Sequence, residues 1–107
     1  MDSSTYQASV SSFFKRLVAA VDSIDPDLLE CDSTGDMVTI TAAKSGTKVI
    51  VNTQRAVSQI WVAGKSMGVH FSLGADGRWM DDKDKGLELG AWVAECVREA
   101  SGVSISL

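Results

Sequence analysis

The sequence predicts an α+β fold, a two-layer α-β sandwich in which two helices pack on one face of an antiparallel sheet. Apolar residues recur at helical spacing only near the two ends of the chain. Between them lie short alternating segments separated by turn residues, with no strand–helix–strand order that would indicate a parallel sheet. At 107 residues the chain is expected to form one domain, residues 1–107, with a modest core.

The first helix is expected over residues 4–23. Ser4, with Gln7 three residues later, fits a capping box at its start, and Pro26 is expected to stop it. The apolar positions that follow helical spacing are Tyr6, Val10, Phe13, Leu17 and Val21.

Six strands are expected after this helix, because alternating apolar residues are separated by Gly-, Ser- and Asp-containing turns. The expected strands are residues 28–32, 37–42, 48–54, 58–64, 68–73 and a short one at 78–80. An antiparallel meander of this kind, covered on one face by both helices, leaves its other face open to water.

Helical spacing returns from Leu89 to Ala100, and Gly102 is a candidate C-cap. The alternating tail at 103–107 is expected to pack back on the body. Residues 81–85 alternate aspartate with lysine, which predicts a solvated loop with Asp84 near the N-cap of the second helix. Two tryptophans are assigned to the core, Trp79 and Trp92.

The bulk composition excludes several classes of function. A formal net charge of -4 and a pI near 4.7 argue against nucleic acid as the main partner. No apolar run approaches a membrane span, and the first residues resemble neither a secretory signal nor a transit peptide. Cys31 and Cys96 form no C-x-x-C pair and are expected to be core or strand thiols, so a cytoplasmic protein with reduced thiols is expected.

The stretch between Arg16 and Lys44 contains no lysine or arginine, yet it holds six acidic residues. These residues are Asp22, Asp25, Asp27, Glu30, Asp32 and Asp36. Carboxylates at a helix C-terminus are disfavoured by roughly a few tenths of a kcal/mol each, so local stability does not explain them. We interpret them as a site for a cation or a basic partner. The alternative is that they protect an edge strand from pairing.

Alternation also predicts what the open face of the sheet carries. If the valine, isoleucine and phenylalanine positions of the central strands face the helices, the intervening residues point outward. The outward residues include Asn52, Gln54, Gln59, Trp61 and His70. An exposed tryptophan among amides and an imidazole is typical of a protein-binding hot spot. The alternative interpretation is that Trp61 simply covers its cross-strand neighbours, and periodicity favours neither interpretation.

Part of this face resembles a known family. Asn52 and Gln54, followed by Gln-Ile-Trp-Val-Ala at 59–63, resemble the signature of the frataxin family. The chain departs from the family pattern at Ala56, where proline is usual. Further segments resemble the bacterial, CyaY-type branch, namely 39–41 and 68–71. The resemblance spans nearly the whole chain and implies the α-β sandwich already predicted.

The resemblance also implies a role. It implies iron binding and regulation or iron donation in iron–sulfur cluster assembly, with a cysteine desulfurase and a cluster scaffold protein as partners. The implied metal ligands, here named the acidic ridge, are Asp22, Asp25, Asp27, Glu30 and Asp32. The implied partner-binding residues, here named the outer-face group, are Asn52, Gln54, Gln59 and Trp61. Bacterial relatives often add acids at positions 23, 28 and 29, so a thinner ridge with weaker iron sites is expected.

The chemistry of the acidic ridge is compatible with this role. Carboxylate oxygens suit Fe²⁺ and Fe³⁺, but surface carboxylates cannot enclose a metal. Iron binding is therefore expected to be weak and rich in water, with other divalent or trivalent cations competing. The same ridge could instead dock on a basic surface of the desulfurase.

The leading interpretation is an iron-binding adaptor that tunes the activity of the desulfurase. The protein is expected to be a monomer, and iron could drive it to form oligomers. One alternative is an iron-oxidising ferroxidase or iron-storage protein, and another is a metal-independent acidic docking module. No phosphate-binding loop, nucleophile elbow or matched Cys/His pair supports other catalysis.

Overall fold

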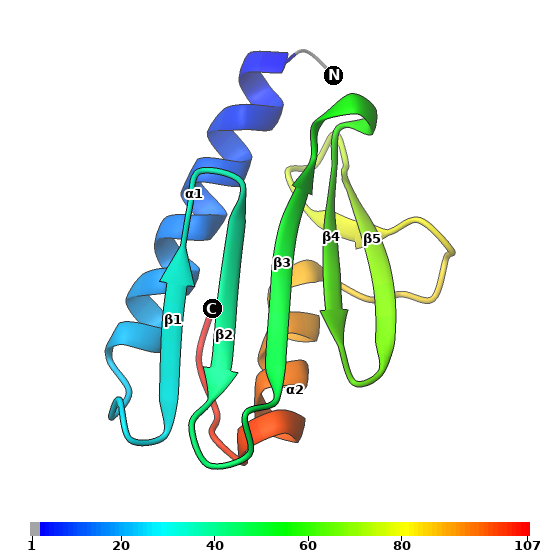
Figure 1. Ribbon diagram of the computed structural model, residues 1–107. Helices are drawn as coiled ribbons and strands as arrows, with labels where there is room; N and C mark the ends of the chain where they lie inside the picture. The colour runs from blue at the N-terminus through cyan, green and yellow to red at the C-terminus, as the bar shows by residue number, and fades with distance from the viewer. Residues whose placement is uncertain (1–2) are drawn as a thin grey trace.

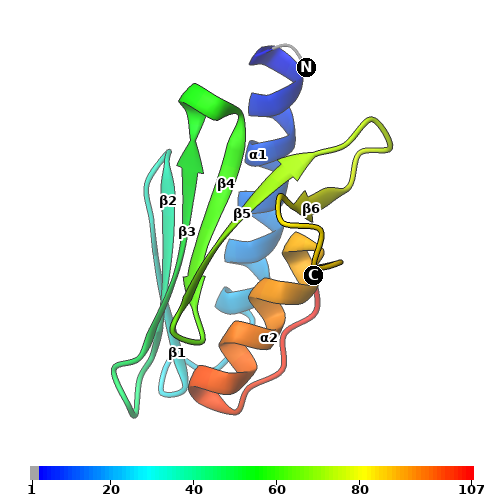
Figure 2. The same ribbon diagram turned by 90° about the vertical axis from the view of Figure 1, so that its right-hand side faces the viewer.

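The computed structural model describes residues 3–107 and has two layers, a twisted sheet and a pair of helices on one of its faces (Figures 1 and 2). The elements in chain order are α1 Ser3–Asp22, β1 Leu29–Ser33, β2 Met37–Ala42, β3 Lys48–Gln54, the 3-10 turn η1 Arg55–Val57, β4 Gln59–Gly64, β5 Met67–Leu73, β6 Trp79–Asp81 and α2 Leu89–Ser101. The predicted fold class is confirmed. Each predicted helix and strand that was given bounds is present within one residue of them.

The sheet is a simple meander whose order is β1-β2-β3-β4-β5-β6, with every neighbouring pair antiparallel. Strands that follow one another in sequence therefore lie side by side. This order leaves β1 at one edge, next to α1, and β6 at the other (Figure 2). Among residues 3–107, no helix is both long and apolar enough to cross a membrane.

The core lies between the sheet and the helices. The predicted helical face of α1 is buried at every position, and Leu17 has no exposed surface. Opposite it, the inward residues of the central strands are fully buried, as predicted from alternation: Val49, Val51, Ile60, Val62 and Phe71. Burying a side chain of this size is worth about 1.5–3 kcal/mol, so this alternation fixes which face of each strand meets the helices.

The start of α1 differs from the prediction. The helix begins at Ser3, so Ser4 lies inside the first turn and does not cap it. Its end agrees with the prediction, because the helix stops at Asp22, shortly before Pro26.

The loop before α2 is exposed at residues 82–85, as charge alternation predicted, but Asp81 at its start is buried. Asp81 is only 7% exposed, and its carboxylate accepts N–H bonds from Lys83, Lys85 and Leu87 at 3.2, 2.8 and 2.9 Å. These bonds, that from Lys85 foremost, hold the pKa of Asp81 below its ordinary value. The loop folds around Asp81 because a buried carboxylate requires such donors.

The N-cap of α2 is Glu88, four residues after Asp84, which was predicted to lie near that position. The Glu88 carboxylate accepts the N–H groups of Gly90 and Ala91, both at 3.0 Å. Asp84 instead sits in the loop with a φ of 55°. Aspartate is among the residues that tolerate this left-handed conformation, which explains its presence there.

The C-terminal end agrees with the sequence pattern. Gly102 has a φ of 75°, and its N–H donates to the carbonyl of Arg98 at 2.7 Å, which closes α2. The tail packs against the core through Val103, Ile105 and Leu107, as expected. Trp79 is a core residue, whereas Trp92 is only partly buried and packs against the core from outside.

Candidate functional site

The outer face of the sheet carries a row of polar and aromatic side chains. The strand register places Asn52 opposite Trp61, and Trp61 opposite His70, across β3, β4 and β5. Each of these side chains is half-buried, while their sequence neighbours Val51 and Val62 are fully buried beneath them. The predicted outward direction of this row is therefore confirmed.

Trp61 is held in place by its own sheet. Its indole lies over Gly68 on β5, where an added Cβ would stand 2.7 Å from Nε1. The His70 ring is 6.5 Å away, centroid to centroid, and tilted by 44°. Trp61 thus does cover its neighbours, yet it remains half-exposed and fixed in orientation. A rigid, partly exposed aromatic ring is also what a binding hot spot needs, because little side-chain entropy is lost on contact.

The two glutamines of the outer-face group lie opposite each other where β3 and β4 are joined by η1. The amide of Gln59 donates to Ser72 Oγ at 3.0 Å and to Asp82 Oδ2 at 3.4 Å. The backbone carbonyl of Gln59 accepts a hydrogen bond from the Tyr6 hydroxyl at 2.7 Å, which ties α1 to this end of the sheet. Gln59 therefore has a structural role besides any contact with a partner.

The other two amides of the outer-face group are available for contacts. Among residues 3–107, the structure assigns no hydrogen bond to the side-chain amides of Asn52 and Gln54, and both residues are half-buried. An amide offers two N–H donors and one carbonyl acceptor, so each of these side chains can bind a partner without first breaking an internal bond.

The acidic ridge follows the edge of the molecule formed by α1 and β1. Asp22 is the last residue of α1, while Glu30 and Asp32 lie on β1 opposite Thr41 and Thr39 of β2. Asp25 and Asp27 lie in the loop between them, where the Asp25 carboxylate accepts the Asp27 N–H at 2.9 Å. All five are exposed, and within residues 3–107 none forms an ion pair.

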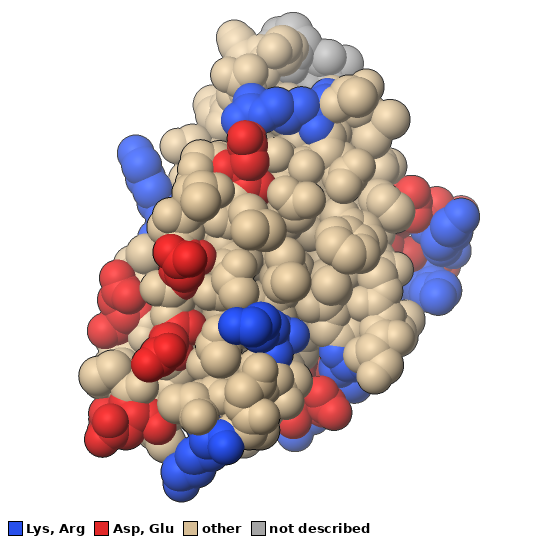
Figure 3. Space-filling model, in the orientation of Figure 1, with Lys and Arg blue, Asp and Glu red and all other residues tan. Residues whose placement is uncertain are grey.

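Figure 3 shows the resulting separation of charge on the outer face. Acidic groups gather along the side where β1 lies, whereas most of the surface over β3, β4 and β5 carries neither sign. The alternation of β1 points Glu30 and Asp32 to the same side of the sheet as Trp61. The acidic edge and the outer-face group are therefore two parts of one continuous surface.

Two charged contacts were missed by sequence reasoning. Asp36 is one of the six acids between Arg16 and Lys44. Its carboxylate accepts hydrogen bonds from Nε and Nη2 of Arg55 at 2.8 and 2.7 Å and from the Thr53 hydroxyl at 3.2 Å. These bonds, chiefly those from Arg55, hold the pKa of Asp36 below its ordinary value. Lys48 lies two strands from Glu30 in the same cross-strand row and donates to Thr41, which lies between them on β2, at 3.3 Å. Only strand pairing brings these groups together, so their positions in the sequence did not predict the contacts.

The ridge does not form a closed metal centre. Within the part of the chain that the structure describes, no group of three His, Cys, Asp or Glu side chains could jointly hold a metal ion. Cys31 lies among the ridge residues, but burial raises the pKa of its thiol, and the charges of Asp22 and Asp32 raise it further. Since thiolates and not thiols bind metals, Cys31 is a poor ligand at neutral pH.

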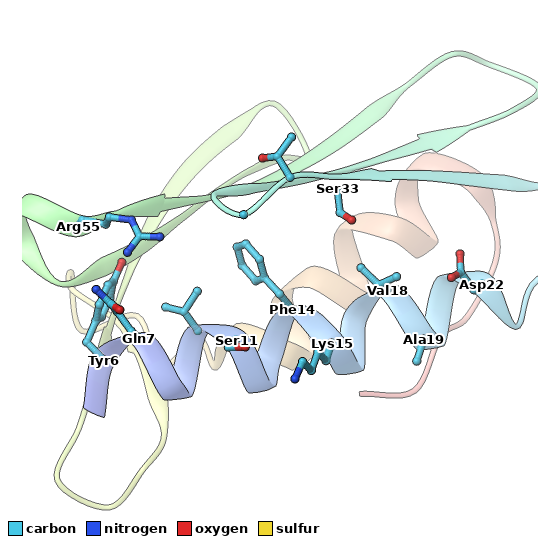
Figure 4. A pocket seen from close by; sticks show the side chains of 13 residues that line it. Tyr6, Gln7, Ser11, Phe14, Lys15, Val18, Ala19, Asp22, Ser33 and Arg55 are labelled. Carbon is cyan, nitrogen blue, oxygen red and sulfur yellow. The ribbon is translucent and has the colours of Figure 1, made fainter. Parts of the chain in front are cut away.

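Two hollows flank β1. One has a volume of about 620 Å³ and lies between α1 and the turn after β1 (Figure 4). Its floor is apolar, with Val10, Phe14 and Val18 from α1. The other, of about 610 Å³, lies beside the ridge residues Glu30 and Asp32. The edge of the sheet at β1 is thus bordered by recesses along its length.

Comparisons with known proteins agree with the geometry. The sequence profile of a family described as a frataxin-like domain matches residues 1–103. The chain is 34% identical to the iron-sulfur cluster assembly protein CyaY of Herminiimonas arsenicoxydans, over 91% of this chain and 94% of the relative. It is 33% identical to the protein of the same name from Tolumonas auensis, over 100% and 99%.

Among solved structures, a frataxin from Psychromonas ingrahamii superposes with a TM-score of 0.85 at 21% identity, over 99% of this chain and 97% of that one. At this level of identity the superposition shows a shared fold.

Proposed function

Since this chain belongs to the frataxin family, we propose that it is an iron-binding regulator or adaptor of iron–sulfur cluster assembly. Its proposed partners are a cysteine desulfurase and the scaffold protein on which clusters form, and its proposed location is the cytoplasm. Relatives that match over nearly their whole length are named iron-sulfur cluster assembly proteins, which supports the general role.

One structural observation carries the proposal: Glu30 and Asp32 of the acidic ridge share one side of the sheet with the outer-face group. A partner that covers this side meets Glu30 and Asp32 at the edge and Trp61 toward the centre. Charge complementarity would guide a basic partner surface to the ridge, while the fixed indole and the available amide of Asn52 would supply short-range contacts. The proposed docking therefore uses both the acidic ridge and the outer-face group.

Iron enters this proposal as cargo held by exposed carboxylates. Each ridge residue can offer one or two oxygens, and water would supply the remaining ligands. The absence of a three-residue ligand group among residues 3–107 fits weak binding in which other divalent or trivalent cations compete. Iron and a basic partner would use the same carboxylates, so each is expected to weaken the binding of the other.

The same observation favours a second candidate, a metal-independent acidic docking module. In that case the ridge would serve only to bind a basic surface, and iron would have no part. The two candidates differ in what Fe²⁺ does to the protein: the iron-binding adaptor binds it at the acidic ridge, whereas the docking module does not respond to it.

The test is an NMR titration of isotope-labelled protein with Fe²⁺ under anaerobic conditions, repeated with the purified desulfurase. We expect resonances of residues 22–32 to shift or broaden in both titrations, and those around Trp61 to respond to the desulfurase alone. A response of the ridge to the desulfurase without any response to Fe²⁺ would replace the iron-binding adaptor with the docking module.

A matched pair of variants separates site from net charge. The double change Glu30→Gln and Asp32→Asn removes two ridge charges, while Asp84→Asn and Glu99→Gln remove two exposed charges elsewhere. We expect the first pair to weaken both Fe²⁺ and desulfurase binding and the second to leave both nearly unchanged. Equal losses in the two pairs would show that net charge alone is sensed.

A further inference from the structure

β1 is an edge strand whose outer side is not paired with another strand of the described chain. Its pairing with β2 is framed by two backbone bonds: Thr34 N–H donates to Met37 at 2.8 Å, and Ala43 N–H donates to Leu28 at 3.0 Å. In an antiparallel pair, alternate residues direct their N–H and C=O groups toward the neighbour. Counting in steps of two from Leu28 and Thr34 therefore assigns each residue of β1 to one side.

By this count Glu30 and Asp32 direct their backbone groups toward β2, and Cys31 and Ser33 direct theirs away from the sheet. Leu29 supports the assignment, because its N–H turns out of the sheet to the carbonyl of Asp25 at 3.2 Å. The side chains alternate between the two faces of the sheet: Cys31 faces the helix layer and is half-buried, while Glu30 and Asp32 are exposed on the outer face. The free edge thus offers unpaired backbone groups from Cys31 and Ser33.

An apolar recess lies behind the Ser33 end of this free edge, between α1 and the turn after β1. In Figure 4, Phe14 and Val18 point from α1 toward the strands, and Ser33 points from β1 into the gap. The recess has a volume of about 620 Å³, and Asp22 lies at one end of it. Two cations line the recess: Arg55 is paired with Asp36, and Lys15 points away from the strands in Figure 4. Apolar side chains that entered from the edge would cover mainly Val18, because Phe14 is only 8% exposed.

We propose that β1 accepts an extended segment of a partner protein as an additional strand, and that this segment alternates basic and apolar side chains. Partner side chains opposite Ser33 would enter the apolar recess, and those opposite Cys31 would meet the second hollow, whose lining includes Val21 and Leu29. Basic side chains of the partner segment opposite Glu30 and Asp32 would lie on the outer face, where opposite charges form favourable cross-strand pairs. This inference shares Glu30 and Asp32 with the proposed function but goes beyond it, because strand addition needs neither iron nor the outer-face group.

Charge decides between a foreign segment and a second copy of this chain. Two β1 edges paired with each other would place Glu30 and Asp32 of each copy beside the same acids of the other, and like charges directly opposite are destabilising. A basic segment has the complementary charge. Acids that only guarded the edge would repel a second copy too, but they would not require an apolar recess behind the strand.

The experiment uses isotope-labelled protein and a short synthetic peptide that alternates lysine and valine. Its control has the same composition with all lysines grouped before the valines. We expect the alternating peptide to slow hydrogen exchange of the Cys31 and Ser33 amides roughly tenfold once about nine-tenths of the protein is bound, and to show backbone contacts to β1. Exchange that is unchanged, or slowed equally by both peptides, would overturn the proposal.

Two further controls test the backbone pairing itself. N-methylation of the peptide on the amides that face β1 is expected to abolish protection, whereas N-methylation on its opposite edge is expected to have little effect. In the protein, Ser33→Pro removes an N–H from the free edge and leaves the pairing with β2 intact, while Ser33→Ala keeps that N–H. Binding that survives both the facing N-methyl groups and Ser33→Pro would show a side-chain attraction without strand addition.

Discussion

The indole of Trp61 on β4 lies against the backbone of Gly68 on β5, so closely that a Cβ on Gly68 would stand 2.7 Å from Nε1. Gly68 does not adopt a positive φ, so its lack of a side chain is explained by this approach alone. The arrangement gives the outer face a fixed aromatic surface while leaving the core beneath it untouched.

Gly68→Ala is therefore expected to displace Trp61 without unfolding the protein. The added methyl group forces the indole to move, at a cost of about 1–3 kcal/mol in the free energy of unfolding. The measurement is the Trp61 indole N–H resonance, together with affinity for the desulfurase, and both are expected to change. Gly35→Ala is the control, because no atom lies within 4 Å of a Cβ added there. An unmoved indole resonance in Gly68→Ala would contradict this account.

Trp61→Ala and Trp79→Ala are expected to separate binding from stability. Trp61 is half-exposed on the outer face, whereas Trp79 is 5% exposed and packs edge-on against Tyr6 with ring centroids 5.9 Å apart. Truncating Trp79 is expected to cost about 3–5 kcal/mol, as for other core aromatics. Truncating Trp61 should cost much less in urea unfolding but weaken partner binding. Unchanged affinity for both partners in Trp61→Ala would remove that residue from the interface.

Asp81→Asn is expected to destabilise the protein in a way that depends on pH. The three N–H bonds hold the pKa of Asp81 below its ordinary value in the folded protein, so the unfolded chain takes up the proton first as pH falls. The stabilisation is therefore present above about pH 4, the ordinary value for aspartate, and is lost as pH falls through the folded pKa. Urea midpoints of wild type and Asp81→Asn should differ at pH 7 and converge in acid.

Asp84→Asn is the matched control for Asp81→Asn, because it lies in the same loop and is exposed. Its φ of 55° suits asparagine as well as aspartate. We expect it to match wild type in stability at both pH values. A similar loss in both variants would mean that loop charge, and not the hydrogen bonds to the Asp81 carboxylate, stabilises this region.

The turn between β4 and β5 offers a stabilising change. Lys65 and Ser66 have φ of 51° and 60°, which a two-residue hairpin turn requires and glycine satisfies most easily. Ser66→Gly is expected to raise the free energy of unfolding by about 0.5 kcal/mol, the relief of strain being partly offset by a more flexible unfolded chain. Ser104→Gly, in the extended tail, should give no gain. Chemical denaturation of both variants decides the point.

The sequence predicted the layers, the strand faces and both helices because burial alternates with periods of two and 3.6 residues along this chain. Helix ends were harder. Glu88 caps α2 because its carboxylate accepts the N–H groups of Gly90 and Ala91, whereas the sequence pattern indicated only that Asp84 lies near the cap. Asp81 looked like one member of a charged run, and only its burial in the folded loop distinguishes it from Asp82 and Asp84.

The candidate site was predictable as two sets of residues but not as a surface. Alternation gave the outward direction of Asn52 and Trp61, and the absence of lysine and arginine between residues 16 and 44 marked the acidic ridge. The pairing of Asp36 with Arg55 is 19 residues apart in sequence and depends on how the ends of the β1–β2 and β3–β4 hairpins meet. The roles of the ridge and of the outer-face group remain predictions until the titrations are made.

The alternation in β4 has a consequence for how this protein can vary. Ile60 and Val62 are buried against the helices, and Trp61 between them faces outward, so core residues alternate along one strand with residues of the outer face. Substitution can change either face while the other stays as it is. A single inserted residue in β4 would exchange the two faces beyond the insertion, exposing core residues and burying outward-facing ones. The outer face can therefore change gradually by substitution, whereas β4 does not tolerate a change in its length.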